Sequence, residues 1–195
     1  MTDAGDWIYT PGEKVAFGHY RQDANDPAPV EIIWQVLAQQ GDYVLLLSEK
    51  ILEVYPFQRR NNGNAWESSL PRNWLNTVFL RFAFDADEQQ SLVPFTVGRE
   101  EAAQQDWVTL AGRRELLRYL PDEASRRAQG TAHAIARGLN IRDNCGWWWL
   151  RSPGFDNSFA SKIAPDGSLA RIGSFVDTDD YAVRPALWIR TDDNS

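Results

Sequence analysis

The chain has 195 residues and a net charge of −7, and 43% of its residues are hydrophobic. This length suits one domain with a buried core, and the composition excludes a largely disordered chain. The acidic balance argues against a sequence-independent nucleic-acid binder, and no apolar run reaches the roughly 18 residues of a membrane helix. Because Cys145 is the only cysteine, an intrachain disulfide and a zinc site of several cysteines are excluded.

The sequence pattern of residues 1–57 predicts β-strands. A short apolar run covers 15–18, and two nearly continuous apolar runs, 32–37 and 43–47, flank the polar sequence 40–42. Two such runs joined by a short polar turn predict a β-hairpin with both faces covered. The polar stretch 58–64 predicts a loop.

The sequence pattern of residues 66–137 predicts a helical region. Ser68 or Ser69 is a suitable N-cap for a first helix. Its apolar face is formed by residues three and four positions apart: Leu70, Trp74, Leu75, Val78, Phe79 and Phe82. Acidic residues at the start of 85–92 predict a short second helix, which Pro94 ends. Further helices are predicted over 111–120 and from 121 toward 137.

Residues 147–190 predict strands at 147–150, 160–163, 169–172 and 182–189, separated by loops rich in Gly, Pro, Asp and Ser. Alternation along a strand places Trp147 and Trp149 on one face and Trp148 on the other, so at least one face belongs to the core. The whole pattern predicts a single α+β domain over 1–195, with its N- and C-terminal strands close together.

Conventional catalytic motifs are absent: there is no Walker loop, dinucleotide-binding fingerprint or nucleophile elbow. We predict structural or surface roles for the two histidines, His19 and His133, and a plain packing role for Cys145. The acidic run 177–180 lacks EF-hand spacing, so a solvated loop is favoured over a calcium site, which stays an open alternative. No metal or cofactor is predicted.

Two arginines, Arg151 and Arg184, lie in apolar surroundings. A partly buried guanidinium needs carboxylate or carbonyl partners. We therefore expect both side chains to brace loops rather than to bind a ligand.

The C-terminal part contains two specific blocks, WWWLRSPG at 147–154 and VRPALWI at 183–189. They resemble an uncharacterised bacterial family whose hallmark is a Trp-Leu-Arg-Ser-Pro-Gly block closed by a Val-Arg-Pro-Ala-Leu block. The segments 15–18, 33–37 and 45–48 are similar to that family's opening hairpin, and 66–76 to its helix signature. The resemblance implies a C-type-lectin-like fold and kinship with the variable proteins of diversity-generating retroelements, which occur in bacteria, phages and prophages.

In those systems a reverse transcriptase rewrites adenines, so that Asn codons become many residue types but not Lys, Glu, Gln, Met or Trp. Between the two blocks, over 155–182, only Lys162 breaks this restriction. The Gly that often precedes Val-Arg-Pro-Ala is Ala182 here. Formylglycine-generating enzymes share the fold class but act through cysteines, and one isolated cysteine does not suit that chemistry.

The resemblance implies a non-catalytic domain that binds a protein or glycan partner through its C-terminal loops. The residues expected to pack the scaffold are Trp149, Leu150, Pro153, Ala160, Ile163, Val176, Val183, Leu187 and Trp188. The residues expected to face solvent and contact the ligand are Phe155, Asp156, Asn157, Ser158, Phe159, Ser161, Ser168, Ala170, Ile172, Ser174, Phe175, Asp177, Asp179 and Tyr181. Exposed Phe and Tyr would be low-entropy anchors. The alternative for Phe155 and Phe159 is an ordinary core position.

Two rival functions remain open. One is an enzyme with a small cleft built from Arg151, Asp177 and either His19 or His133. The other is an accessory module of a larger surface or phage protein. The first ten residues lack the basic and apolar regions of a Sec signal, which predicts synthesis in the cytoplasm and display or phage association through a partner. No nucleic-acid partner or direct membrane insertion is expected, and the sequence does not predict the oligomeric state.

Overall fold

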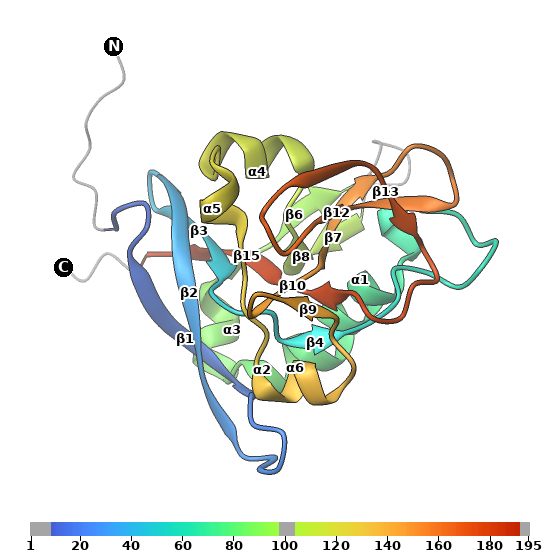
Figure 1. Cartoon of the computed structure of the whole chain (residues 1–195). Coiled ribbons are helices and arrows are strands. Elements are labelled where there is room, and N and C mark those ends of the chain that lie inside the picture. The colour runs from blue at the N-terminus through green and yellow to red at the C-terminus, as the bar shows by residue number, and fades with distance from the viewer. Residues whose placement is uncertain (1–8, 98–103, 192–195) are drawn as a thin grey trace.

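Two β-sheets form the framework of the protein, and the computed structural model describes it over residues 9–97 and 104–191 (Figure 1). The first sheet has the order β1 (Lys14–Arg21), β2 (Pro29–Gln40), β3 (Tyr43–Ser48), β15 (Pro185–Arg190) and β5 (Leu92–Val93), with β8 (Val108–Leu110) also paired to β15. The second has the order β13 (Leu169–Phe175), β12 (Phe159–Ile163), β11 (Trp148–Pro153), β14 (Ala182–Val183) and β4 (Glu53–Val54). The pair β11–β14 is parallel, and the other pairs are antiparallel.

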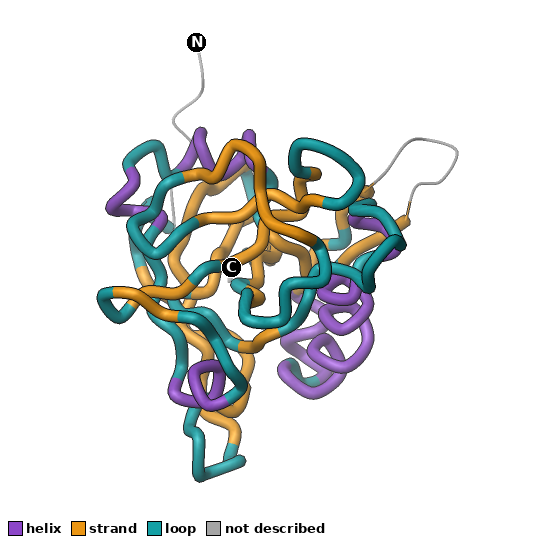
Figure 2. The backbone as a smooth tube through the Cα atoms, turned by 45° about the vertical axis from the view of Figure 1, so that its right-hand side comes forward, coloured by secondary structure: helices purple, strands orange, loops and turns teal. Residues whose placement is uncertain are grey.

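Short pairs and helices complete the fold. The small pairs are β6 (Phe95–Val97) with β7 (Gln104–Asp106), and β9 (Ile141–Arg142) with β10 (Cys145–Gly146). The helical segments are η1 (Trp66–Ser68), α1 (Leu70–Trp74), the π-helical turn η2 (Leu75–Phe79), α2 (Leu80–Ala83), α3 (Ala86–Ser91), α4 (Arg113–Tyr119), α5 (Glu123–Arg126) and α6 (Ala132–Ala136). Figure 2 shows the helices around the outside of the strands. The chain is thus a mixed α+β protein, and over the described residues no helix is long and apolar enough to cross a membrane.

Several predicted elements are confirmed. The runs 32–37 and 43–47 form the β2–β3 hairpin, in which Gln40 pairs with Tyr43 across the turn. Ser69 caps α1 by accepting a hydrogen bond from the Arg72 backbone N–H at 3.3 Å. Asp85 and Glu88 form a capping box at the start of α3, which explains why an acidic start specifies this helix.

The predicted apolar face of the first helix is wrong at two positions. Val78 is 48% exposed and Phe82 is 72% exposed, whereas Phe79 is buried. The reason is the turn η2, in which the N–H of Leu80 donates to the carbonyl of Leu75, five residues earlier. A π turn contains about one residue more than an α-helical turn, so residues within it, such as Val78, and beyond it, such as Phe82, are rotated away from the face that a regular helix would give them.

The predicted helix from 121 toward 137 is also wrong, because it is two short helices. Between α5 and α6 the backbone is extended: Gln129 forms a bridge with Cys145, and Gly130 forms one with Ile51. Tertiary strand-like pairing thus overrides the weak helical pattern of this stretch.

The predicted strand 182–189 is divided between the two sheets. β14 belongs to the second sheet and β15 to the first, with Arg184 between them. Pro185 has no N–H to donate to a continuing ladder, and the chain changes sheet there.

The core lies between and around the sheets, in two clusters. Trp34, Leu46, Trp74, Phe79 and Trp149 are buried in the first cluster, as expected. Trp148 and Leu150 are buried in the second, so β11 is covered on both faces. Two of the predicted packing residues differ: Pro153 is exposed, and Trp188 is only partly buried.

Candidate functional site

Exposed apolar side chains gather on the β12–β13 hairpin and the turn before it. Phe155 is 77% exposed, Ile172 59% and Phe175 58%. The Phe155 N–H donates to the Ile172 carbonyl at 2.9 Å, and the Phe159 ring lies 4.5 Å from the Phe175 ring. These four residues are called the hairpin patch below. Large exposed apolar side chains in one place are typical of an interaction surface.

A bulge in β13 explains why Ile172 and Phe175 can both face solvent. Ala160 pairs with Ser174 and Lys162 with Ala170, so β13 uses four steps where β12 uses two. Gly173, with φ of +92°, lies in this stretch and takes a conformation that other residues rarely adopt. Such an insertion resets the alternation of side chains along a strand.

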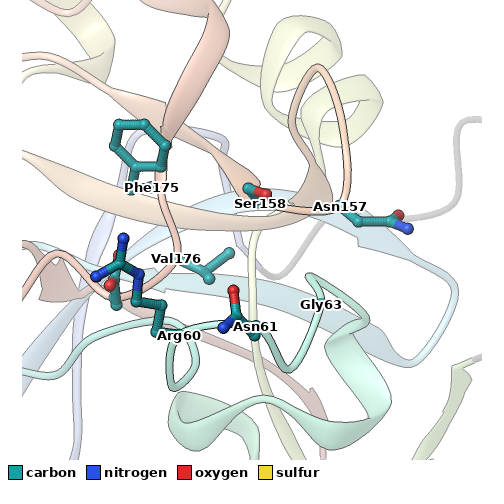
Figure 3. A pocket seen from close by; sticks show the side chains of 8 residues that line it. Arg60, Asn61, Gly63, Asn157, Ser158, Phe175 and Val176 are labelled. Atoms are coloured by element: carbon teal, nitrogen blue, oxygen red, sulfur yellow. The ribbon is translucent and has the colours of Figure 1, made fainter.

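A hollow of about 560 Å³ lies beside the hairpin patch (Figure 3). One wall is the 58–64 loop, and the other is formed by the turn before β12 and the end of β13. The lining residues are Arg60, Asn61, Gly63, Asn157, Ser158, Phe175, Val176 and Asp177. In Figure 3 the side chains of Arg60 and Asn61 rise from the loop toward the opposite wall. The hollow therefore offers a guanidinium, a carboxylate and amides beside an aromatic ring.

The two walls are joined by the side chain of Asn64 and by a backbone hydrogen bond of Gln58. Asn64 Nδ2 donates to the carbonyls of Asp156 and Phe159 at 2.8 and 2.7 Å. The Gln58 backbone N–H donates to the Val176 carbonyl at 2.8 Å. These bonds fix the separation of the two walls.

Sequence reasoning missed the wall formed by Arg60, Asn61 and Gly63. The stretch was expected only to be a loop, and its position beside 157–177 depends on tertiary contacts. The available signal was the run Asn61-Asn62-Gly63-Asn64, which is typical of a tight, structured turn. Asn61 indeed has φ of +66°.

The predicted contact residues are not all at the surface. The exposed ones are Phe155, Asp156, Asn157, Ser158, Ile172, Phe175, Asp177 and Asp179, and the partly buried ones are Phe159, Ser168, Ala170, Ser174 and Tyr181. Ser161 is a correction: it is fully buried, because its Oγ donates to the Pro153 carbonyl at 2.7 Å and accepts from Arg113 at 3.1 Å. The alternative core position is wrong for Phe155.

Tyr181 is held in a fixed orientation at the edge of this region. Lys162 Nζ donates to its hydroxyl at 2.6 Å and lies 4.3 Å from its ring centroid. The ring packs edge-on against Trp149 at 5.0 Å and stacks with Trp147 at 6.0 Å. Lys162 is thus part of the supporting structure rather than a free surface cation.

The arginines of the two sequence blocks, Arg151 and Arg184, are bound by acceptors within the protein. Arg184 is buried and donates to the carbonyls of Ser48 and Arg126 at 2.8 and 3.4 Å, with its guanidinium 4.9 Å from the Trp148 ring. Burial lowers the pKa of Arg184 to about 10, so it stays charged at neutral pH. Arg151 donates to the Leu110 carbonyl and pairs with Glu115 at 2.6 Å.

The residues of the enzyme alternative do not meet in one hollow. His133 is buried, with Nε2 3.0 Å from Glu53 Oε2, and His19 is exposed on β1. Arg151 and Asp177 line different hollows. Over 9–97 and 104–191, no group of three or more His, Cys, Asp and Glu is arranged to hold a metal ion.

Glu53 is instead the centre of a buried polar network. Its carboxylate accepts hydrogen bonds from the Tyr20 hydroxyl at 2.9 Å and from the Val54 N–H at 3.0 Å, and pairs with Arg21 and Arg137 at 3.3 Å each. Burial alone would raise the pKa of Glu53, but the bonds from His133, the Val54 N–H and Tyr20 hold it below its usual range. Burial and the neighbouring Glu53 charge raise the pKa of Tyr20.

No curated protein and no solved structure matches the chain significantly. One family model does match, over residues 41–191, which cover β3 to β15 and include both sequence blocks and both walls of the hollow. The chain therefore belongs to the family described as Domain of unknown function (DUF6273).

Proposed function

We propose that this protein is a non-catalytic binding domain that recognises a partner protein through the hairpin patch and the adjacent hollow. The observation that carries the proposal is the exposure of Phe155, Ile172 and Phe175 on one hairpin. More than half of each side chain faces solvent, and a partner would bury this apolar surface. Aromatic anchors with few rotatable bonds contribute most of the energy in such interfaces.

The finer part of the proposal is a C-type-lectin-like domain of the kind diversified by retroelements. Two features support it. The residues of the two blocks, such as Trp149, Leu150 and Arg184, are buried, whereas most of the segment between them is exposed or partly buried. Lys162, the one residue between the blocks that adenine rewriting would not produce, makes a supporting contact with Tyr181. A segment arranged in this way can vary while its supports stay constant.

A glycan is the second candidate partner, and the lining of the hollow favours it. Asn61, Asn157, Asp177 and Arg60 offer planar polar groups beside the Phe175 ring. Planar amides and carboxylates suit the paired hydroxyls of a sugar, and an aromatic face suits its apolar side. In this case the hollow, rather than the hairpin patch, would carry the affinity.

The test removes apolar surface from the patch and from a matched control. Phe155→Ser, Ile172→Ser and Phe175→Ser are combined in one variant, and Val78→Ser with Phe82→Ser in the other, since these too are exposed apolar residues. A partner is captured from cell-surface fractions with the wild type, purified, and titrated against each variant by calorimetry. We expect the patch variant to bind at least about a hundredfold more weakly and the control to bind as the wild type does.

The glycan candidate has its own measurement on a glycan array. A protein that binds a glycan should lose that binding on Asp177→Asn with Asn157→Ala, but keep it in the patch variant. Two outcomes of the calorimetric titration would contradict the main proposal. One is that the control variant with Val78→Ser and Phe82→Ser no longer binds the protein partner, and the other is that the patch variant binds it as tightly as the wild type does.

A further inference from the structure

A second groove lies between the start of α4 and the end of β11. It has a volume of about 430 Å³ and is lined by Gly112, Arg113, Arg114, Glu115, Arg151, Ser152 and Pro153. Three guanidinium groups thus share one groove with one carboxylate, in a chain whose net charge is −7. We call it the arginine groove.

The single carboxylate is already satisfied within the protein. Glu115 Oε1 lies 2.6 Å from Arg151, and Oε2 accepts a hydrogen bond from the Gly112 N–H at 3.0 Å. Gly112 gives the Arg151 guanidinium room to lie against the backbone, because a Cβ there would be 3.1 Å from its Cζ. The charges of Glu115 and Arg151 therefore compensate each other within the lining of the groove.

The charges of the other two arginines are not compensated by a carboxylate among the described residues. The Nη2 of Arg113 donates to the Pro153 carbonyl and to Ser161 Oγ, each at 3.1 Å, and these acceptors are neutral. Arg114 is exposed. Within the part of the chain that the structure describes, neither side chain has a carboxylate at ion-pair distance. Ser161 thus orients a cation, which explains why a serine at this position is buried.

We propose that the arginine groove binds an acidic segment of a partner protein, whose carboxylates pair with Arg113 and Arg114. A guanidinium held by neutral acceptors is ready to take a carboxylate in a planar, two-bond geometry. The groove continues into a hollow of about 340 Å³ that shares Arg151, Ser152 and Pro153. An extended space of this kind fits a stretch of peptide better than a single small anion.

Glu67 lines the continuation of the groove, and its negative charge decides which part of the groove takes the acidic residues of the bound segment. Like charges repel, so the acidic side chains would lie on the α4 side and neutral residues beside Glu67. The groove shares no lining residue with the hairpin patch, and its failure would leave the proposed function standing.

The probe is a short fluorescent peptide of alternating Glu and Ser, measured by anisotropy at low ionic strength against the same peptide with Gln for Glu. The groove variant combines Arg113→Gln with Arg114→Gln. The control combines Arg81→Gln with Arg190→Gln, which removes the same charge from two other exposed arginines. We expect the Glu peptide to bind the wild type and the control equally, and the groove variant at least about tenfold more weakly. The Gln peptide should bind none of them.

Because Arg113 also supports Ser161, Arg114→Gln alone serves as the variant that leaves the fold intact, and it should weaken the Glu peptide measurably. Equal weakening by the groove variant and the control would overturn the proposal, since only overall charge would then matter. Absence of Glu-peptide binding to the wild type would also overturn it. Saturable binding of inorganic phosphate without binding of the Glu peptide would assign the groove to a different ligand.

Discussion

Arg184 stands at the point where the chain passes from β14 in one sheet to β15 in the other, and its donors reach carbonyls from two other segments of the chain. We expect Arg184→Ala to lower the free energy of unfolding by about 2–4 kcal/mol, since it opens a cavity and leaves the Ser48 carbonyl unpaired. Denaturant titration measures this change. Arg190→Ala, at an exposed position on the next strand, should stay within about 0.5 kcal/mol. If both substitutions change the free energy of unfolding by a similarly small amount, the buried guanidinium of Arg184 does not stabilise the fold.

Glu53 gives a pH dependence whose sign follows from its lowered pKa. A carboxyl whose pKa is lower in the folded than in the unfolded chain stabilises the fold above the unfolded pKa, and this contribution is lost as the pH falls through the folded value. We therefore expect Glu53→Gln to lower the free energy of unfolding by about 3 kcal/mol at neutral pH, because its partners lose a buried charge. The difference from the wild type should shrink as the pH falls below about 4.

The matched control for Glu53 is Glu49→Gln, since Glu49 pairs with Lys14 at the surface. Exposed pairs of this kind contribute little, so its effect should be below about 1 kcal/mol at every pH. A pH-independent effect of Glu53→Gln would mean that the network acts through shape alone.

At the scale of elements, the π turn η2 decides which aromatic residues of the long helical segment enter the core. We expect Phe79→Ala to lower the free energy of unfolding by about 3–5 kcal/mol, because Phe79 packs against Tyr20, Trp74 and Phe84. Phe82→Ala should change it by about 0.5 kcal/mol or less, since that ring is exposed. Comparable costs for the two substitutions, measured by urea titration, would show a regular α-helix in solution.

The same elements show what the sequence could and could not predict. The β2–β3 hairpin and the α3 capping box depend on neighbouring residues, so local pattern was sufficient. The π turn and the change of sheet at Arg184 depend on what packs against the chain, and an apolar run such as 182–189 looks the same whether it forms one strand or two.

At the scale of the molecule, the sequence identified one half of the candidate site. Most residues between the two blocks are exposed or partly buried, but the opposite wall comes from Arg60 and Asn61, about a hundred residues earlier in the chain. Nothing local links these segments. The link is made by Asn64 and Gln58, whose hydrogen bonds join the loop to residues 156–176.

This division between supports and surface leads to a last prediction. Asn157→Ala, Ile172→Ala and Asp177→Ala, combined, replace exposed side chains for which no side-chain hydrogen bond to another described residue is found. We expect the melting temperature to change by only about 2 °C or less, because the core around Trp149 does not use them. Asn64→Ala alone should lower the free energy of unfolding by about 1 kcal/mol, since the carbonyls of Asp156 and Phe159 each lose one of two donors and the loop loses its side-chain link to them. Calorimetric melting of both variants decides the matter: if the triple variant melts lower than Asn64→Ala, the exposed segment is part of the folding core and is not a surface free to vary.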